Sequence, residues 1–218
     1  MLANWIECAR RVNPVRVARK TLAPAPARPD WANDQARFWL AAGLVLAAGI
    51  VRLLPHPMNF APIGAMALFG GAHFPKKRWA FCLPLAALFA GDLAQHLVTG
   101  RGFHELMPAV YGSFAAVVLL GFLLRSRRGV LRVGAAACAG SALFFAVTNF
   151  AVWAMLDTYP PTAAGLAACY LAALPLLGNP LAGDLSYAVL LFGGFALAGR
   201  RWPVFAMPTA ASWATPAG

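Results

Sequence analysis

The chain has 218 residues, of which 61% are hydrophobic and only 11% are charged. A soluble domain carries about 25% charged residues, and its apolar residues recur periodically instead of forming long runs. The composition therefore excludes an ordinary soluble domain and predicts an integral membrane protein. The net charge of +11 comes from cations at the edges of apolar segments, so we expect contact with membrane lipids and no nucleic-acid partner.

The apolar runs favour helices over a β-barrel. A membrane-spanning chain must form either a helix bundle or a closed barrel, and barrel strands are short and alternate in polarity. The runs here are longer and do not alternate. The four cysteines (Cys8, Cys82, Cys138 and Cys169) have neither paired nor metal-ligand spacing, so we expect no disulfide, no bound metal and no other cofactor.

Both ends of the chain differ from its middle. Residues 1–37 contain seven of the eighteen Lys and Arg residues, include the Pro-rich stretch Leu22–Pro29, and have no apolar core long enough for a signal peptide. We expect a basic, disordered cytoplasmic tail, with a surface-lying helix over Trp5–Val17 as the alternative. Residues 202–218 are expected to form a loose tail, which leaves residues 38–201 as the transmembrane domain.

Six apolar segments in this domain are predicted to cross the membrane as helices. In chain order they are Phe38–Leu54, Asn59–Phe74, Trp79–Val98, Pro108–Leu124, Val130–Met155 and Leu181–Ala198. A further apolar segment, Thr162–Leu177, is interrupted by Pro175 and bounded by prolines. We predict that it forms a half-helix or an outer hairpin packed on the bundle.

The distribution of cations predicts the orientation of these helices. With the N-terminus in the cytoplasm, sixteen of the eighteen Lys and Arg residues fall on the cytoplasmic side, and only Arg52 and Arg101 remain outside. A six-helix bundle with both termini inside therefore satisfies the positive-inside rule at every loop. A seventh crossing would place Arg200 and Arg201 outside, which argues against it.

Polar residues within the predicted helices point to a binding site. Such residues are costly in a membrane and usually mark a cavity or a helix contact. In this topology they gather towards the outer helix ends, whereas the inner half is built from Ala, Leu, Phe and Gly. We therefore expect a cavity that opens to the outside. The residues predicted to line it are Asn59, Asp92, His96, Asn149, Trp153 and Asp184, with His56 and Tyr159 in a lid.

Each of these residues also has a structural alternative. Asp92 and His96 are four residues apart on one helical face. They could satisfy each other, contact a ligand, relay a proton, or supply two ligands of a metal site that would still need more donors. Asp184 near a helix N-terminus is stabilised by the macrodipole, and Asn149 could join two helices. Trp153 and Tyr159 could belong to the belt of aromatic residues at the membrane surface.

Motifs for soluble-type catalysis are missing from the sequence. It has no phosphate-binding loop and no His-Glu-x-x-His zinc motif, and it has no nucleophile elbow with a matched base. We therefore expect that the protein is not an enzyme.

Four motifs carry a resemblance to a known family. They are Arg52-Leu-Leu-Pro-His-Pro-x-Asn-Phe-x-Pro-Ile-Gly-Ala-x-Ala-Leu-Phe-Gly-Gly-Ala72, Leu83-Pro-Leu-Ala-Ala-Leu-Phe-x-x-Asp92, Val147-Thr-Asn-Phe-x-Val-Trp153 and Gly178-Asn-x-Leu-x-Gly-Asp184. Over about Leu40–Arg201 the chain resembles an uncharacterised bacterial family of transport-type proteins. That family is similar to the substrate-binding S components of energy-coupling factor (ECF) transporters.

The resemblance implies a fold, a location and partners. S components have six helices, both termini inside, and an outward-facing pocket that is closed by outer loops and binds a small nutrient. The implied location is the bacterial inner membrane, and the implied partners are a membrane coupling subunit and its ATPases. Where many S components carry Ala-x-x-x-Ala in the first helix, this chain has Gly43-x-x-x-Ala47. If the ligand were cobalamin held by a cysteine, Cys82 would be the residue to test.

The sequence thus predicts a membrane component that binds a small, vitamin-like nutrient for uptake, with cobalamin as one candidate. Two alternatives stay open. The first is a non-catalytic membrane subunit that stabilises another complex. The second is an intramembrane enzyme that acts on a lipid or isoprenoid, with Asp92 and His96 as acid and base.

Overall fold

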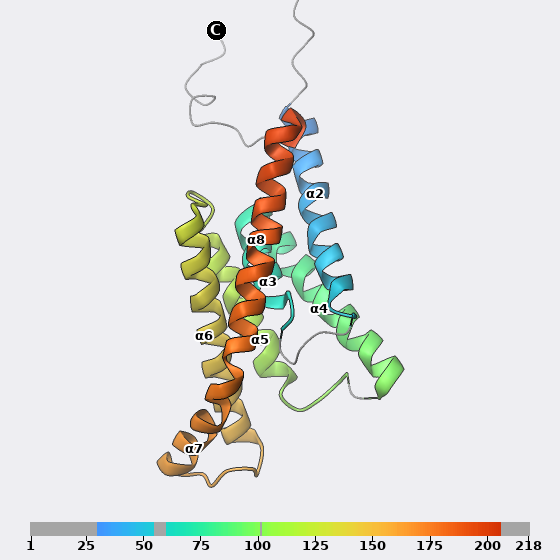
Figure 1. Cartoon of the computed structure of the whole chain (residues 1–218). Helices are drawn as coiled ribbons and strands as arrows, with labels where there is room; N and C mark the ends of the chain where they lie inside the picture. Colours follow the sequence, from blue (N-terminus) through green and yellow to red (C-terminus); the bar gives the residue numbers. More distant parts are fainter. Residues whose placement is uncertain (1–29, 55–59, 101, 206–218) are drawn as a thin grey trace, which may run out of the picture. The chain divides into compact units, whose positions relative to one another are not determined.

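The computed structural model describes residues 30–54, 60–100 and 102–205 (Figure 1). All contacts given below lie within one compact unit of the chain, which begins at Trp31. Every regular element in the described residues is helical, which confirms the all-α class. The helices are α2 (Asp30–Val51), α3 (Ile63–His73), α4 (Lys77–Thr99), α5 (Met107–Phe122), α6 (Val130–Met155), α7 (Ala163–Ala173) and α8 (Gly178–Arg201), with 3-10 turns at Leu174–Leu176 and Pro203–Phe205.

Four helices in the described residues are long and apolar enough to cross a membrane, namely the Asn33–Val51 part of α2 and the whole of α4, α6 and α8. The predicted helix Val130–Met155 is confirmed with the same bounds. Helix α2 begins at Asp30, inside the segment predicted to be a disordered tail. Its polar first turns stay helical beyond the apolar run, because Arg37 donates to Asp34 across one turn at 2.8 Å.

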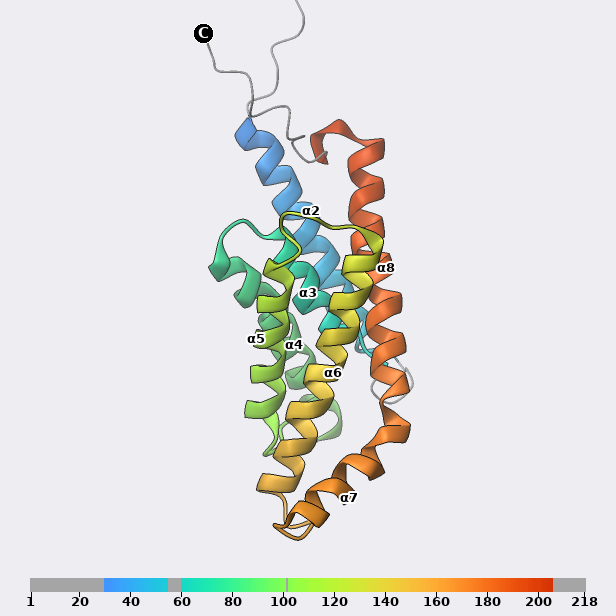
Figure 2. The same ribbon diagram turned by 90° about the vertical axis from the view of Figure 1, so that its left-hand side faces the viewer.

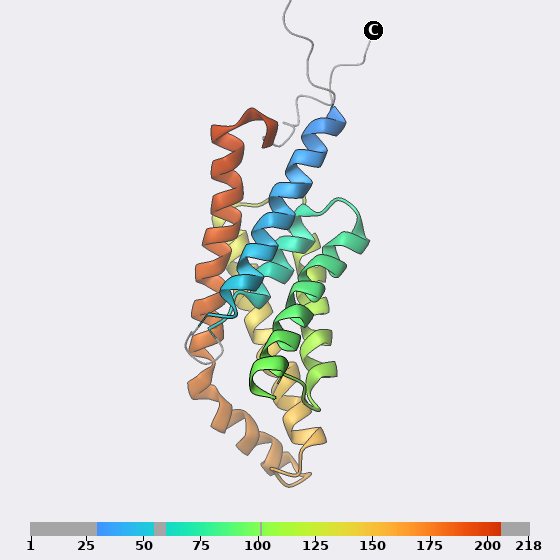
Figure 3. The ribbon, with the colours of Figure 1, turned by 90° about the vertical axis from the view of Figure 1, so that its right-hand side faces the viewer.

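Helix α3 is short and lies in the interior. All of its residues from Gly64 to Ala72 are buried, and it packs against α4, α5, α6 and α8. Figures 2 and 3 show it enclosed by its neighbours. Its 11 residues extend over about 16 Å, roughly half of a bilayer core of about 30 Å. In its described part, the predicted crossing Asn59–Phe74 therefore forms a helix of about half the length that a crossing needs. The helix begins after Pro62, and it ends before Phe74 because Pro75 forces that residue into an extended conformation.

Helices α3 and α5 cross at a pair of glycines. A Cβ placed on Gly71 would lie 2.9 Å from the Gly121 Cα and would overlap the Val118 carbonyl. A Cβ on Gly121 would lie 2.8 Å from the Gly71 Cα. Because small residues let two backbones approach closely, these glycines allow α5 to cover one side of α3.

The C-terminal end of α3 is held by two arginines from the loop between α5 and α6. Arg125 donates from Nε to the Gly71 carbonyl at 2.9 Å and from Nη2 to the Phe74 carbonyl at 2.7 Å. Arg128 donates from Nη2 to the Ala72 carbonyl at 2.7 Å. Burial, and secondly the charge of Arg125, lower the pKa of Arg128, but an arginine remains protonated in a protein. The two cations therefore satisfy the last carbonyls of α3 and complement its dipole.

The segment Thr162–Leu177, predicted to be a half-helix or a hairpin, forms α7 and the 3-10 turn after it. Together these two elements are too short to count as a membrane span. Thr162 caps α7 by accepting from the Gly165 amide at 3.1 Å. The Tyr170 hydroxyl donates to the Ala146 carbonyl of α6 at 2.6 Å. Helix α7 thus packs on α6, at the end of the bundle away from the start of α2 (Figures 1 and 2).

Candidate functional site

A cavity of about 560 Å³ lies where α2 and α4 end and α3 and α8 begin. Helix α4 lines it with residues from its last turns and α8 with residues from its first turns, so the cavity lies at the end of the bundle opposite Lys77 and Arg201. The described lining is Arg52, Leu53, Leu54, Ala61, Ile63, Gly64, Gly91, Ala94, Gln95, Val98, Thr99, Phe114, Phe144, Pro180 and Asp184.

Asp184 lies in this wall and caps α3 from another helix. Its Oδ1 accepts from the Ala65 amide at 3.0 Å, and its Oδ2 accepts from the Ser141 hydroxyl at 2.7 Å. Gly64 packs so closely on the carboxylate that a Cβ there would collide with it. The first amides of a helix have no partner within the helix, and a carboxylate beside them is stabilised by the helix dipole. Asp184 therefore joins α8, α6 and the start of α3 at the cavity.

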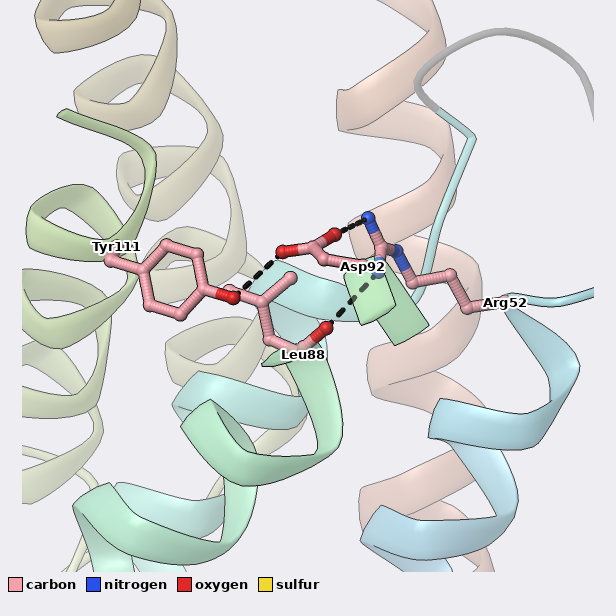
Figure 4. A network of polar contacts seen from close by, with 4 residues as sticks. All are labelled: Arg52, Leu88, Asp92 and Tyr111. Atoms are coloured by element: carbon pink, nitrogen blue, oxygen red, sulfur yellow. Dashed lines mark hydrogen bonds and ion pairs between the residues drawn. The ribbon is translucent and has the colours of Figure 1, made fainter. Parts of the chain in front are cut away.

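A second polar network joins α2, α4 and α5 (Figure 4). Arg52 donates from Nη2 to Oδ1 of Asp92 at 2.7 Å and from Nη1 to the Leu88 carbonyl at 3.3 Å. The Tyr111 hydroxyl donates to Oδ2 of Asp92 at 2.7 Å. A Cβ on Gly91 would lie 2.5 Å from Arg52 Nη1, so this glycine makes room for the guanidinium. Both oxygens of the buried Asp92 thus have a partner, and the side chain of Arg52 reaches the cavity wall.

The structure brings two of the predicted site residues to this region. Asp184 lines the cavity, and Asp92 lies next to it through Arg52. His96 is exposed, and its ring contacts Phe103 at a centroid distance of 4.9 Å. The alternative in which Asp92 and His96 satisfy each other is therefore wrong. Arg52 and Tyr111 of α5 donate hydrogen bonds to the Asp92 carboxylate instead.

Three other predicted residues lie towards α7 and do not line the cavity. Asn149 donates from Nδ2 to the Phe145 carbonyl of its own helix at 2.8 Å. Trp153 donates from Nε1 to the Pro160 carbonyl at 3.0 Å, and Tyr159 is half-buried in the loop before α7. The contact of Trp153 joins α6 to the connection that follows it. His56 and Asn59 lie outside the described residues.

Several residues of the site were not predicted from the sequence. Arg52 was treated only as a marker of the outer side, and Ser141 and Tyr111 were not considered. Arg52 could have been a signal, because it lies inside the predicted helix Phe38–Leu54 and a charged residue within a membrane segment usually pairs with another polar group. Ser141 and Tyr111 offered no such signal, since their roles depend on which helices become neighbours. In the part of the chain that the structure describes, no three His, Cys, Asp or Glu residues are arranged to hold a metal.

Length, composition and the enclosed central helix define a helical membrane protein with four helices of spanning length among the described residues. The chain belongs to a family described as "Family of unknown function (DUF6580)", which it matches over residues 32–206. No curated protein matches the chain. No solved structure matches it either.

Proposed function

We propose that this protein is the substrate-binding membrane component of an uptake system and that it holds a small polar nutrient in the cavity between α2, α3, α4 and α8. The cavity is the observation that carries the proposal. Its volume of about 560 Å³ falls within the roughly 300–1,000 Å³ of small-molecule sites, which combine apolar walls with a few polar groups. Here the polar groups include the carboxylate of Asp184 and the guanidinium of Arg52.

Binding is favoured over intramembrane catalysis by the surroundings of the candidate acid and base. Asp92 is held between Arg52 and Tyr111, and both of its oxygens accept a hydrogen bond. His96 is exposed and contacts Phe103 instead of Asp92. A general base must lie within reach of the proton that it removes, and both oxygens of Asp92 are already held by Arg52 and Tyr111.

The proposed topology has six crossings, with both termini in the cytoplasm of a bacterial cell and the cavity facing outwards. It is supported by the separation of the cavity from Lys76, Lys77 and the arginines at the end of α8. The half-length helix α3 is compatible with a crossing, because non-helical backbone is tolerated at membrane depth where it lines a cavity or is buried in protein. Ala61, just before α3, lines the cavity.

A membrane coupling subunit with ATPases is part of this proposal. The sequence has no phosphate-binding loop of its own, so ATP-driven uptake requires a partner. Gly43 and Ala47 are exposed on α2, and a Cβ on Gly43 would meet open space. Small residues on an outward helix face allow another helix to approach closely, which makes this face of α2 a suitable contact surface.

The test of binding is retention of a small molecule by purified protein in lipid nanodiscs, measured by native mass spectrometry and by extraction. Ala94→Trp places a large side chain in the cavity wall, whereas Ala90→Trp, one turn earlier on α4, adds it to an exposed position. We expect the wild type and Ala90→Trp to retain the molecule and Ala94→Trp to lose it. Equal retention in both variants would place the ligand elsewhere.

The orientation has its own test. In a background without native cysteines, Lys77→Cys places a single exposed thiol at the start of α4, and His104→Cys places one in the segment that follows the end of α4. A membrane-impermeant maleimide added to intact cells should label His104→Cys and leave Lys77→Cys unlabelled until the membrane is opened. The reverse pattern would turn the cavity towards the cytoplasm and end the uptake proposal.

A further inference from the structure

We infer that the ligand of this cavity carries a positive charge on an apolar or aromatic body and that Asp184 receives that charge. This inference rests on the proposed function and adds the chemical class of the ligand. Three observations support it: the partners of Asp184, the neutralised charge of Arg52, and the aromatic residues in the wall.

Among the described residues, the hydrogen-bond partners of Asp184 are all uncharged. Its hydrogen-bond donors are the backbone amides at the start of α3 and the Ser141 hydroxyl. Within the described residues, the ion pairs are Arg37–Asp34 and Arg52–Asp92, so Asp184 belongs to none. An ionised carboxylate offers about four acceptor positions, which leaves space for a further donor from the cavity. The start of α3 supplies roughly half a positive charge, which reduces the negative charge without cancelling it.

Arg52 does not balance Asp184, because its charge is already matched. Its guanidinium is 2.7 Å from Asp92, and both side chains are largely buried, with 16% and 9% exposure. The pair is neutral as a unit. Among the described residues that line the cavity, Arg52 and Asp184 carry formal charges. Once the Arg52–Asp92 pair is counted as neutral, one negative charge is left among the described residues of the wall, and it complements a cation.

The cavity wall also contains two stacked aromatic rings. Phe114 and Phe144 both line the cavity, with ring centroids 5.0 Å apart and an interplanar angle of 26°. The face of an aromatic ring attracts a cation and does not attract an anion. A ligand with a cationic group and an apolar body would thus find a carboxylate and two aromatic side chains in one site.

The inference is tested with three probes of similar size and different charge. These are 2-phenylethylammonium, 2-phenylethanol and phenylacetate, and their binding to full-length protein in nanodiscs is measured by ligand-observed NMR at neutral pH. We expect the ammonium to bind about tenfold or more tighter than the alcohol, as a charged hydrogen bond implies, and phenylacetate to bind more weakly still. Asp184→Asn should remove the preference for the ammonium. Phe144→Leu, which leaves the contacts of Asp184 intact, should reduce it.

The outcomes separate this inference from the proposed function. Binding of the alcohol or of phenylacetate at the affinity of the ammonium would overturn the charge assignment and leave the cavity as a ligand site. If no probe binds, the net charge of the molecule retained on purification decides: a cation supports the inference, and a neutral or anionic molecule overturns it. If nothing binds and nothing is retained, the proposed function itself fails, and the inference fails with it.

Discussion

Removal of Asp92 should destabilise the protein much more than removal of Asp34, although each carboxylate is paired with an arginine. The distances are nearly the same, 2.7 Å for Arg52–Asp92 and 2.8 Å for Arg37–Asp34. The arginines are also similarly buried, with 16% and 15% of the side chain exposed. The acids differ, because Asp92 is 9% exposed and Asp34 is 69% exposed. The chain therefore contains its own control for the effect of burial.

The expected magnitudes follow from that difference. Removing one member of a buried ion pair costs about 3–5 kcal/mol in soluble proteins, and an exposed pair contributes roughly 0.2–1 kcal/mol. Hydrogen bonds between membrane helices reach only about 1.7 kcal/mol, because the unfolded chain in the membrane also finds partners. We therefore expect Asp92→Ala to cost about 3 kcal/mol, at the lower end of the range for buried pairs, and Asp34→Ala to cost less than about 0.5 kcal/mol.

A double-mutant cycle measures the pair itself. The free energy of unfolding is determined by SDS titration in mixed micelles for wild type, Arg52→Ala, Asp92→Ala and the double variant. The coupling energy should be about 2 kcal/mol, because the double variant leaves no buried charge without its partner. Additive single losses, or equal losses for Asp34→Ala and Asp92→Ala, would refute the view that burial makes this pair strong.

Three further variants and two control variants test the supports of α3 by the same titration. Gly71→Ala should cost about 1–3 kcal/mol, because the new methyl group overlaps the backbone of α5. Gly43→Ala, which faces open space, should be neutral or stabilising, by up to about 1 kcal/mol; equal effects would contradict the close crossing. Arg125→Leu should cost about 2–3 kcal/mol through two orphaned carbonyls of α3, whereas the exposed neighbour Arg127 should tolerate the same change, and equal losses would remove the capping role. Ser141→Ala should cost about 1–2 kcal/mol by removing a donor to a buried carboxylate, and an unchanged stability would show that this hydrogen bond contributes little.

The helices could be predicted from the sequence to the extent that apolar runs determine them. The run Val130–Met155 gave both ends of α6, because Gly129 precedes it and Leu156 leaves the helical conformation after it. The apolar run Asn59–Phe74 indicated a helix but overstated its length, since α3 has only 11 residues and a helix buried in protein is as apolar as one that faces lipid. Hydrophobicity reports removal from water, and it does not distinguish lipid from neighbouring protein.

The partners of the polar residues could not be predicted from spacing along the chain. A separation of four residues allowed His96 as a partner of Asp92, but the structure supplies Arg52, forty residues earlier, and Tyr111 from the next helix. Asp184 was predicted to gain from a helix dipole, and it does so at the start of α3 instead of its own helix. Residues distant in sequence become neighbours only through helix packing, which one sequence does not specify.

A short buried helix needs partners at both of its ends, because its first amides and last carbonyls have none within the helix. In α3 the carboxylate of Asp184 meets the first amides, and the guanidinium groups of Arg125 and Arg128 meet the last carbonyls. Each charge has the sign that the helix dipole favours. The same carboxylate faces the cavity, so a cation bound there would share Asp184 with the start of α3. Binding and the placement of α3 would then depend on one side chain, which is why the charge preference and the fold must be tested with separate variants.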